Sequence, residues 1–148
     1  MGPDMRILIA EDELVSRRVL EKSLETWGYE VIAAENGNEA WEELDGDDAP
    51  RLAILDWVMP GQDGIEVCRR VREKETDRPT YIILLTAKSQ TEDIVTGLQT
   101  GADDYVKKPF DRDELRARLD VGRRIIGMQD SLSQRVMNWR QLSRISNS

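Results

Sequence analysis

Residues 52–64 read LAILDWVMPGQDG, and this stretch decides the fold. Its first four residues are apolar, and the run ends in an acid, Asp56, before a turn that contains Pro60 and Gly61. A continuous apolar run of this length, closed by turn residues, is typical of a strand buried on both faces of a sheet. The sequence therefore places a carboxylate where a buried strand ends.

Short apolar runs and helical patterns alternate along the rest of the chain. Strands are expected at 6–10, 30–34, 52–56, 81–85 and 105–106, and helices at 14–27, 36–44, 64–74, 91–100 and from 111 onward. The apolar runs are near-continuous, as in strands covered on both faces. This order predicts an α/β fold, a doubly wound five-stranded parallel sheet with an extended C-terminal helix.

The composition limits the class of protein. The 148 residues are 39% hydrophobic and 34% charged, which suits one domain with a buried core. No apolar run reaches about 18 residues and the N-terminus lacks a signal-peptide pattern, so we expect no membrane span. A single cysteine, Cys68, suits the reducing cytoplasm. The absence of histidine excludes histidine-based catalysis and metal ligation.

The charge is unevenly distributed. Residues 111–148 hold eight arginines and five acidic residues, a net charge of +3, so the total of −8 leaves −11 for residues 1–110. An acidic body argues against a broad nucleic-acid-binding surface, and we expect no direct binding of nucleic acid.

Chemistry-bearing residues follow the expected strands. Glu11 and Asp12 follow the first, Asp56 ends the third, Thr86 follows the fourth and Lys108 the fifth. Ligands bind at this edge of open α/β sheets. Carboxylates ~4 Å apart repel by about 4 kcal/mol at an effective dielectric constant of about 20, and a divalent cation relieves this repulsion. Oxygen ligands alone favour Mg²⁺, and a carboxylate can attack phosphorus.

Each of these residues also has a structural interpretation. Glu11 and Asp12 are suited to capping the helix that begins near Leu14. Thr86 is suited to ending a strand, and Tyr105 to half-buried packing.

The set Glu11-Asp12, Asp56 with Met59-Pro60 and Gly64, Thr86-Ala87 and Lys108-Pro109-Phe110 resembles the receiver domain of two-component response regulators. The resemblance covers residues 5–126. It implies a flavodoxin-like sheet of order 2-1-3-4-5. It also implies that the domain catalyses its own phosphorylation and dephosphorylation: Asp56 accepts phosphate from the phosphohistidine of a sensor kinase or phosphotransfer protein, with Mg²⁺ required.

The resemblance also assigns roles. It implies that Asp12, Asp56 and the main-chain carbonyl of Val58 bind the metal, with Glu11 holding it through water. Thr86 and Lys108 would contact the phosphoryl group, Tyr105 would move with Thr86 as a switch, and Lys108–Pro109 would be a cis peptide. Side chains at Val58 and Lys88 would flank the path of the hydrolytic water, and an apolar Val58 predicts slow self-dephosphorylation.

Residues 127–148 extend past the receiver as a helical extension or linker. Gly122 and Gly127 are expected to weaken the helix. Apolar residues then recur in an imperfect heptad-like pattern, which Arg135 interrupts. The apolar positions of this seam are Ile125, Met128, Leu132, Trp139 and Leu142. It predicts either a helix that packs back on its own domain or one that pairs with a second copy upon phosphorylation and leads to an output domain.

The final LSRISNS resembles the segment that precedes GGDEF diguanylate cyclase domains. Three alternatives remain at this point. The chain could be a stand-alone receiver, or an interaction module of receiver fold that does not take phosphate. A flavodoxin-like cofactor binder is disfavoured, because residues 11–13 are three acids that would repel a cofactor phosphate.

Overall fold

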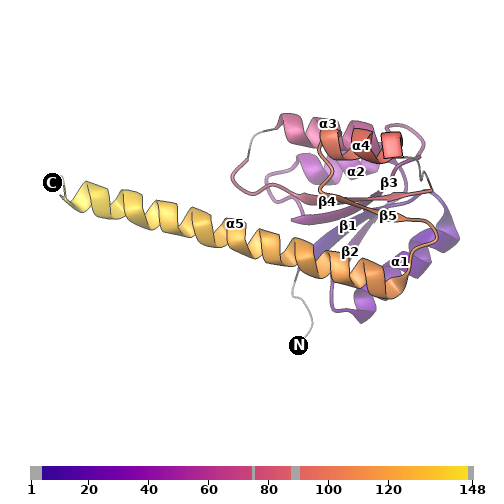
Figure 1. Ribbon diagram of the computed structural model, residues 1–148, viewed down its shortest axis with the longest axis horizontal. Helices are drawn as coiled ribbons and strands as arrows, with labels where there is room; N and C mark the ends of the chain where they lie inside the picture. Colours follow the sequence, from indigo (N-terminus) through magenta and orange to yellow (C-terminus); the bar gives the residue numbers. More distant parts are fainter. Residues whose placement is uncertain (1–4, 75, 88–90, 147–148) are drawn as a thin grey trace.

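Five parallel strands form the central sheet of the computed structural model, which describes residues 5–74, 76–87 and 91–146 (Figure 1). The strands are β1 (Arg6–Ala10), β2 (Glu30–Ala34), β3 (Leu52–Asp56), β4 (Tyr81–Thr86) and β5 (Asp104–Lys107). Their order across the sheet is β2-β1-β3-β4-β5, and every neighbouring pair is parallel. The prediction of a flavodoxin-like sheet is confirmed.

Helices cover both faces of this sheet (Figure 1). They are α1 (Leu14–Thr26), α2 (Gly37–Asp45), α3 (Gly64–Glu73), α4 (Thr91–Thr100) and α5 (Arg112–Ser146). Helices α1 and α5 lie on one face, and α2, α3 and α4 lie on the other (Figure 1). The order of strands and helices is the one that the apolar patterns predict.

The core has one apolar layer on each face, and β3 and β4 contribute to both. All residues of β3 and β4 are buried. On one side Leu55 and Leu84 pack with residues of α2 and α3, and on the other Ile54 and Ile83 pack with residues of α1 and α5. Alternate residues of each central strand therefore serve opposite layers, which explains why their sequences are apolar without interruption.

The last helix is continuous through both of its glycines, contrary to the expected weakening. Gly122 lies directly on the sheet, where an added Cβ would come within 2.8 Å of the Tyr81 ring. Glycine at this position therefore permits the close approach of α5 to β4, and packing outweighs its low helix propensity. Gly127 has open space around it.

Beyond the body, α5 projects away from the sheet (Figure 1). Its outer part carries large apolar side chains that are exposed, namely Met128, Leu132, Val136, Met137, Trp139 and Leu142. They do not pack back on the domain, so this part of the helix is an uncovered surface. Among the described residues, no helix is both long and apolar enough to cross a membrane.

Candidate functional site

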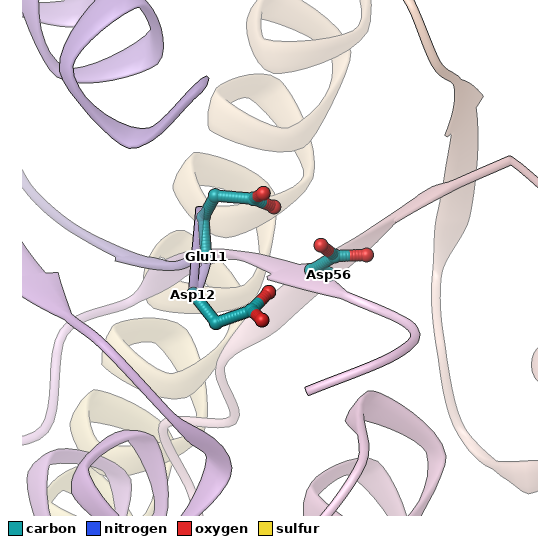
Figure 2. Close-up of side chains that lie close together, drawn as sticks. All are labelled: Glu11, Asp12 and Asp56. Atoms are coloured by element: carbon teal, nitrogen blue, oxygen red, sulfur yellow. The ribbon is translucent and has the colours of Figure 1, made fainter. Parts of the chain in front are cut away.

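Three carboxylates gather at the carboxyl ends of the neighbouring strands β1 and β3 (Figure 2). Glu11 and Asp12 follow β1 and Asp56 ends β3, and one carboxylate oxygen of each lies within 4.8 Å of the others. Glu11 and Asp56 are buried, whereas Asp12 is exposed to solvent. The sheet order brings together acids that are 44 or more residues apart in the chain.

The capping interpretation of Glu11 and Asp12 does not hold. Helix α1 is capped by Glu13, whose carboxylate accepts hydrogen bonds from the backbone N–H groups of Val15 and Ser16 at 3.1 and 2.6 Å. Glu11 and Asp12 are therefore available for the pocket.

The lysine that directly follows β5 joins the acids. The Nζ atom of Lys108 lies 2.8 Å from Glu11 Oε2 and 2.6 Å from Asp56 Oδ2. The Lys108 backbone N–H donates to the Thr86 carbonyl at 2.9 Å, which joins the ends of β4 and β5. The peptide bond between Lys108 and Pro109 is cis, as the resemblance implies.

The pocket shifts the pKa values of the buried Glu11 and the partly buried Lys108. Burial first, and then the neighbouring Asp56 carboxylate, raise the pKa of Glu11 to about 7, although Lys108 opposes this effect. Burial lowers the pKa of Lys108, but its hydrogen bonds to Asp56 and Glu11 outweigh burial, and the result is a raised pKa. The lysine therefore keeps its positive charge between two carboxylates.

The turn after β3 aligns Asp56. The Gly64 N–H donates to the Trp57 carbonyl at 2.8 Å, and a Cβ at Gly64 would lie 2.4 Å from the Asp56 carbonyl oxygen. Only glycine lets α3 begin this close to the strand end. The Val58 N–H lies 3.4 Å from Asp56 Oδ1, and the Val58 side chain is 65% exposed.

The remaining candidates lie around this pocket. Thr86 ends β4 and is buried, one position beyond Leu85, the register partner of Asp56. Tyr105 is partly buried, packs against the core cluster of the α2–α3 face and has the Arg118 guanidinium 5.9 Å from its ring centre. Lys88 lies outside the described residues.

One further residue of this region, Arg17, was not predicted from the sequence. It lies one turn into α1, and its guanidinium reaches back to the carbonyls of Glu11 and Asp12. An arginine a short distance after an acidic pair would have been the only signal, and periodicity alone does not reveal a contact with backbone carbonyls.

The donor set fits a hard divalent cation. All side-chain ligands in the cluster are carboxylate oxygens, and one of them, Asp12, faces solvent. Mg²⁺ prefers oxygen ligands and keeps several of its waters, so a partly open cluster of three carboxylates is suitable. Glu11, Asp12 and Asp56 are the residues that could hold it.

The fold and the pocket define a flavodoxin-like α/β domain with a cluster of three acids and a charged lysine at the carboxyl edge of its sheet. Residues 7–120 match the family model described as "Response regulator receiver domain". The chain belongs to the response regulator receiver family.

Relatives share this region. PhoB of Pseudomonas aeruginosa, a phosphate regulon transcriptional regulatory protein, is 43% identical over 125 residues, which are 84% of this chain and 54% of PhoB. The chemotaxis protein CheY1 of Helicobacter pylori is 33% identical over 127 residues, 85% of this chain and 100% of CheY1. The chain thus spans about half the length of the transcriptional regulators that it matches and the full length of CheY1.

Solved structures agree with this assignment. The receiver domain of the Francisella response regulator 1452 superposes with a TM-score of 0.74 at 30% identity, covering 80% of this chain and 96% of that one. A chain from the co-crystal structure of the Saccharomyces cerevisiae histidine phosphotransfer signaling protein Ypd1 and the Ssk1 receiver domain gives 0.72 at 25% identity, covering 80% and 88%.

Proposed function

We propose that Asp56 accepts a phosphoryl group from a phosphohistidine of a sensor kinase or phosphotransfer protein, in a Mg²⁺-dependent reaction. The observation that carries this proposal is Lys108, whose Nζ atom bridges Glu11 and Asp56 beside the solvent-facing Asp12. The arrangement combines an oxygen nucleophile, a candidate cation site and a positively charged lysine in one pocket.

The proposed reaction uses these groups in turn. An Asp56 carboxylate oxygen attacks phosphorus, the bond from phosphorus to the donor imidazole nitrogen breaks, and the imidazole leaves with that electron pair. Mg²⁺ bound by Asp12, Asp56 and the Val58 carbonyl, with Glu11 acting through water, would supply positive charge to the phosphoryl oxygens.

Lys108 and Thr86 complete the site. The Lys108 ammonium would transfer its hydrogen bond from Asp56 to a phosphoryl oxygen, and the Thr86 hydroxyl would donate to another. Movement of Thr86 toward the phosphate, followed by inward movement of Tyr105, would be the conformational switch.

The surface next to the pocket suits a protein donor. Leu14, Val15 and Val19 of α1 are exposed apolar side chains, and α1 begins directly beyond the acidic loop. Exposed apolar patches of this kind mark interaction sites. The similar Ssk1 receiver was crystallised with a histidine phosphotransfer protein, and we propose a partner of this class.

Beryllofluoride and a small acyl phosphate test the proposal. Acetyl phosphate with Mg²⁺ should phosphorylate the wild-type chain at one site, and Asp56→Asn should abolish this phosphorylation. Mg²⁺ with beryllofluoride should change the tryptophan fluorescence of the wild type, and Trp57→Phe would assign the signal. The alternative, an interaction module that does not take phosphate, predicts neither labelling nor a fluorescence response.

We further propose that residues 5–126 are the receiver and that residues 127–148 carry its signal, through pairing with a second copy, to an output domain. The exposed apolar side chains of α5 include Leu132 and Val136, which lie about one helical turn apart. On a straight helix Val136 lies about 40° around the axis from Leu132, among the exposed apolar residues, so the heptad-like seam omitted Val136. Two pairs of exposed apolar residues on α5 are spaced by eleven residues, a repeat close to the natural helix period: Val121 and Leu132, and Met128 and Trp139.

Light scattering with and without beryllofluoride tests the pairing. We expect a dimer with beryllofluoride, and Leu132→Glu should prevent it. Met137→Glu is the matched control, because Met137 is equally exposed but lies on the opposite side of the helix. A monomer under both conditions would contradict the pairing.

The nature of the output domain is a separate proposal. The resemblance of LSRISNS to the segment before GGDEF domains makes a diguanylate cyclase the candidate, with a stand-alone receiver as the alternative. Although relatives such as PhoB are named as transcriptional regulators, the charge of −11 on residues 1–110 disfavours nucleic-acid binding by this chain itself. Cys68 is free and buried, which fits the proposed cytoplasmic location.

A further inference from the structure

Arg17 joins α1 to the loop that carries two of the three acids. Its Nη1 atom donates to the Glu11 carbonyl at 2.9 Å and lies 3.4 Å from the Asp12 carbonyl. Its Nη2 atom lies 3.5 Å from a Glu35 carboxylate oxygen beyond β2. Only 12% of the Arg17 side chain is exposed, so the guanidinium is confined rather than solvated.

The loop between β1 and α1 is very short. Glu11, Asp12 and Glu13 are its only residues. Its ends are fixed by the hydrogen bond from the Glu11 N–H to the Ala34 carbonyl and by the Glu13 cap. Between these two fixed ends, the Arg17 guanidinium orients the carbonyls of Glu11 and Asp12 toward itself. Because a peptide unit is planar, a fixed carbonyl restricts ψ of its own residue and φ of the next, and with them the directions of the side chains.

We propose that Arg17 is a positioning residue for the divalent cation site. It holds the Glu11 and Asp12 backbone in the orientation that lets their carboxylates converge with Asp56, and it touches neither the cation nor the phosphoryl group. The inference rests on the proposed Mg²⁺ site. Loss of an outer hydrogen bond that orients metal ligands typically costs ten- to a hundredfold in metal affinity.

The sign of the effect separates positioning from simple electrostatics. A guanidinium near the loop repels a cation, so removal of its charge alone would tighten Mg²⁺ binding. Loss of positioning would weaken it. Lysine keeps the charge but not the rigid fork of donors that reaches two carbonyls at once, so Arg17→Lys should resemble Arg17→Gln.

Arg18 is a matched control. It is the adjacent arginine on α1 and is exposed, and its side chain makes no hydrogen bond or ion pair with the described residues. Arg18→Gln removes the same charge from the same helix turn without a change at the loop carbonyls.

Mg²⁺ titration by calorimetry on the wild type, Arg17→Gln, Arg17→Lys and Arg18→Gln tests the inference. We expect Mg²⁺ to bind about tenfold more weakly to both Arg17 variants, and Arg18→Gln to equal the wild type or bind slightly more tightly. Hydrogen exchange in EDTA should be faster at residues 11–13 in both Arg17 variants. If Arg17→Gln proves unstable, Arg17→Lys carries the test.

Two results would overturn the inference. One is wild-type or tighter Mg²⁺ affinity in the Arg17 variants. The other is a lower melting temperature in EDTA with unchanged Mg²⁺ affinity, which would show that Arg17 stabilises α1 and does nothing for the site. If the wild type itself bound no Mg²⁺, the proposed function would fail, and this inference with it.

Discussion

Arg51 and Asp130 form an ion pair, with 2.7 Å between the guanidinium and the carboxylate, across 79 residues of sequence. Arg51 is buried, and it also donates to the side chain of Gln129 and to the carbonyl of Pro79, each at 3.2 Å. Arg51 directly precedes β3, the strand that ends in Asp56. The segment of α5 around Asp130 is thereby attached to the strand that carries the proposed phosphoacceptor.

Asp130→Asn should loosen this attachment. The change leaves a buried guanidinium without its counter-charge, and because Asp130 is half exposed we expect a loss of about 1–2 kcal/mol in the free energy of unfolding. The rate of backbone amide hydrogen exchange should increase in α5 from Gly127 onward. Denaturant unfolding and exchange mass spectrometry measure the two effects.

Asp120→Asn is the control for this prediction. It breaks the exposed pair with Arg123 at 3.4 Å on the same helix, where a loss below about 0.5 kcal/mol is expected. Equal effects of the two substitutions would contradict the proposed role of the Arg51 pair.

The two glycines of α5 should respond in opposite directions to alanine. Gly127→Ala adds a methyl group in open space and favours the helix, so a gain of up to about 1 kcal/mol is expected. Gly122→Ala forces a methyl group against the Tyr81 ring and should destabilise by about 1–3 kcal/mol. Thermal unfolding compares the two, and stabilisation by both would show that α5 does not pack closely on β4.

These cases show what the sequence could and could not predict. The alternation of strands and helices and the acidic edge follow from local patterns, because apolar runs define buried strands and their carboxyl ends meet at one edge. The order of the strands across the sheet came from the family resemblance. Contacts between side chains that are distant in the sequence leave no periodic signal, so the sequence could not predict the ion pair between Arg51 and Asp130. For the same reason the glycines of α5 were interpreted by helix propensity alone, whereas the sheet determines the role of Gly122.

Gly64→Ala should disturb the proposed active site through the backbone. The new Cβ would collide with the Asp56 carbonyl, so the strand end must move. We expect a destabilisation of about 1–3 kcal/mol and a weaker fluorescence response to beryllofluoride. Gly46→Ala is the control, since its nearest neighbouring atom is 4.0 Å away. A full beryllofluoride response in Gly64→Ala would show that this close contact is not needed.

Glu11 should make stability depend on pH when Mg²⁺ is absent. Its pKa rises from 4.5 to about 7 in the folded chain, chiefly through burial, so between these values the folded state holds a proton that the unfolded state has released. Raising the pH through this window therefore favours unfolding, by about 1.4 kcal/mol for each unit of the shift. Below pH 4.5 this contribution is absent.

Denaturant unfolding in EDTA between pH 5 and 8 measures this effect as the difference between the wild type and Glu11→Gln. The amide does not titrate, so the wild type should lose stability relative to the variant as the pH rises. Parallel pH profiles for the two proteins would contradict the raised pKa. Saturating Mg²⁺ should reduce the wild-type loss, because the cation favours the ionised carboxylates.

Val58 should set the lifetime of the phosphorylated state. Its exposed side chain lies beside Asp56 and offers no hydrogen bond to an attacking water, so we expect slow self-dephosphorylation in the wild type. Val58→Asn supplies an amide that can orient this water and should shorten the lifetime several-fold. Val95→Asn, which makes the same change at an exposed position of α4, should leave it unaltered. The measurement is the decay of radiolabelled protein after removal of the donor, and a wild-type lifetime of only seconds, or equal decay in Val58→Asn, would show that Val58 does not limit hydrolysis.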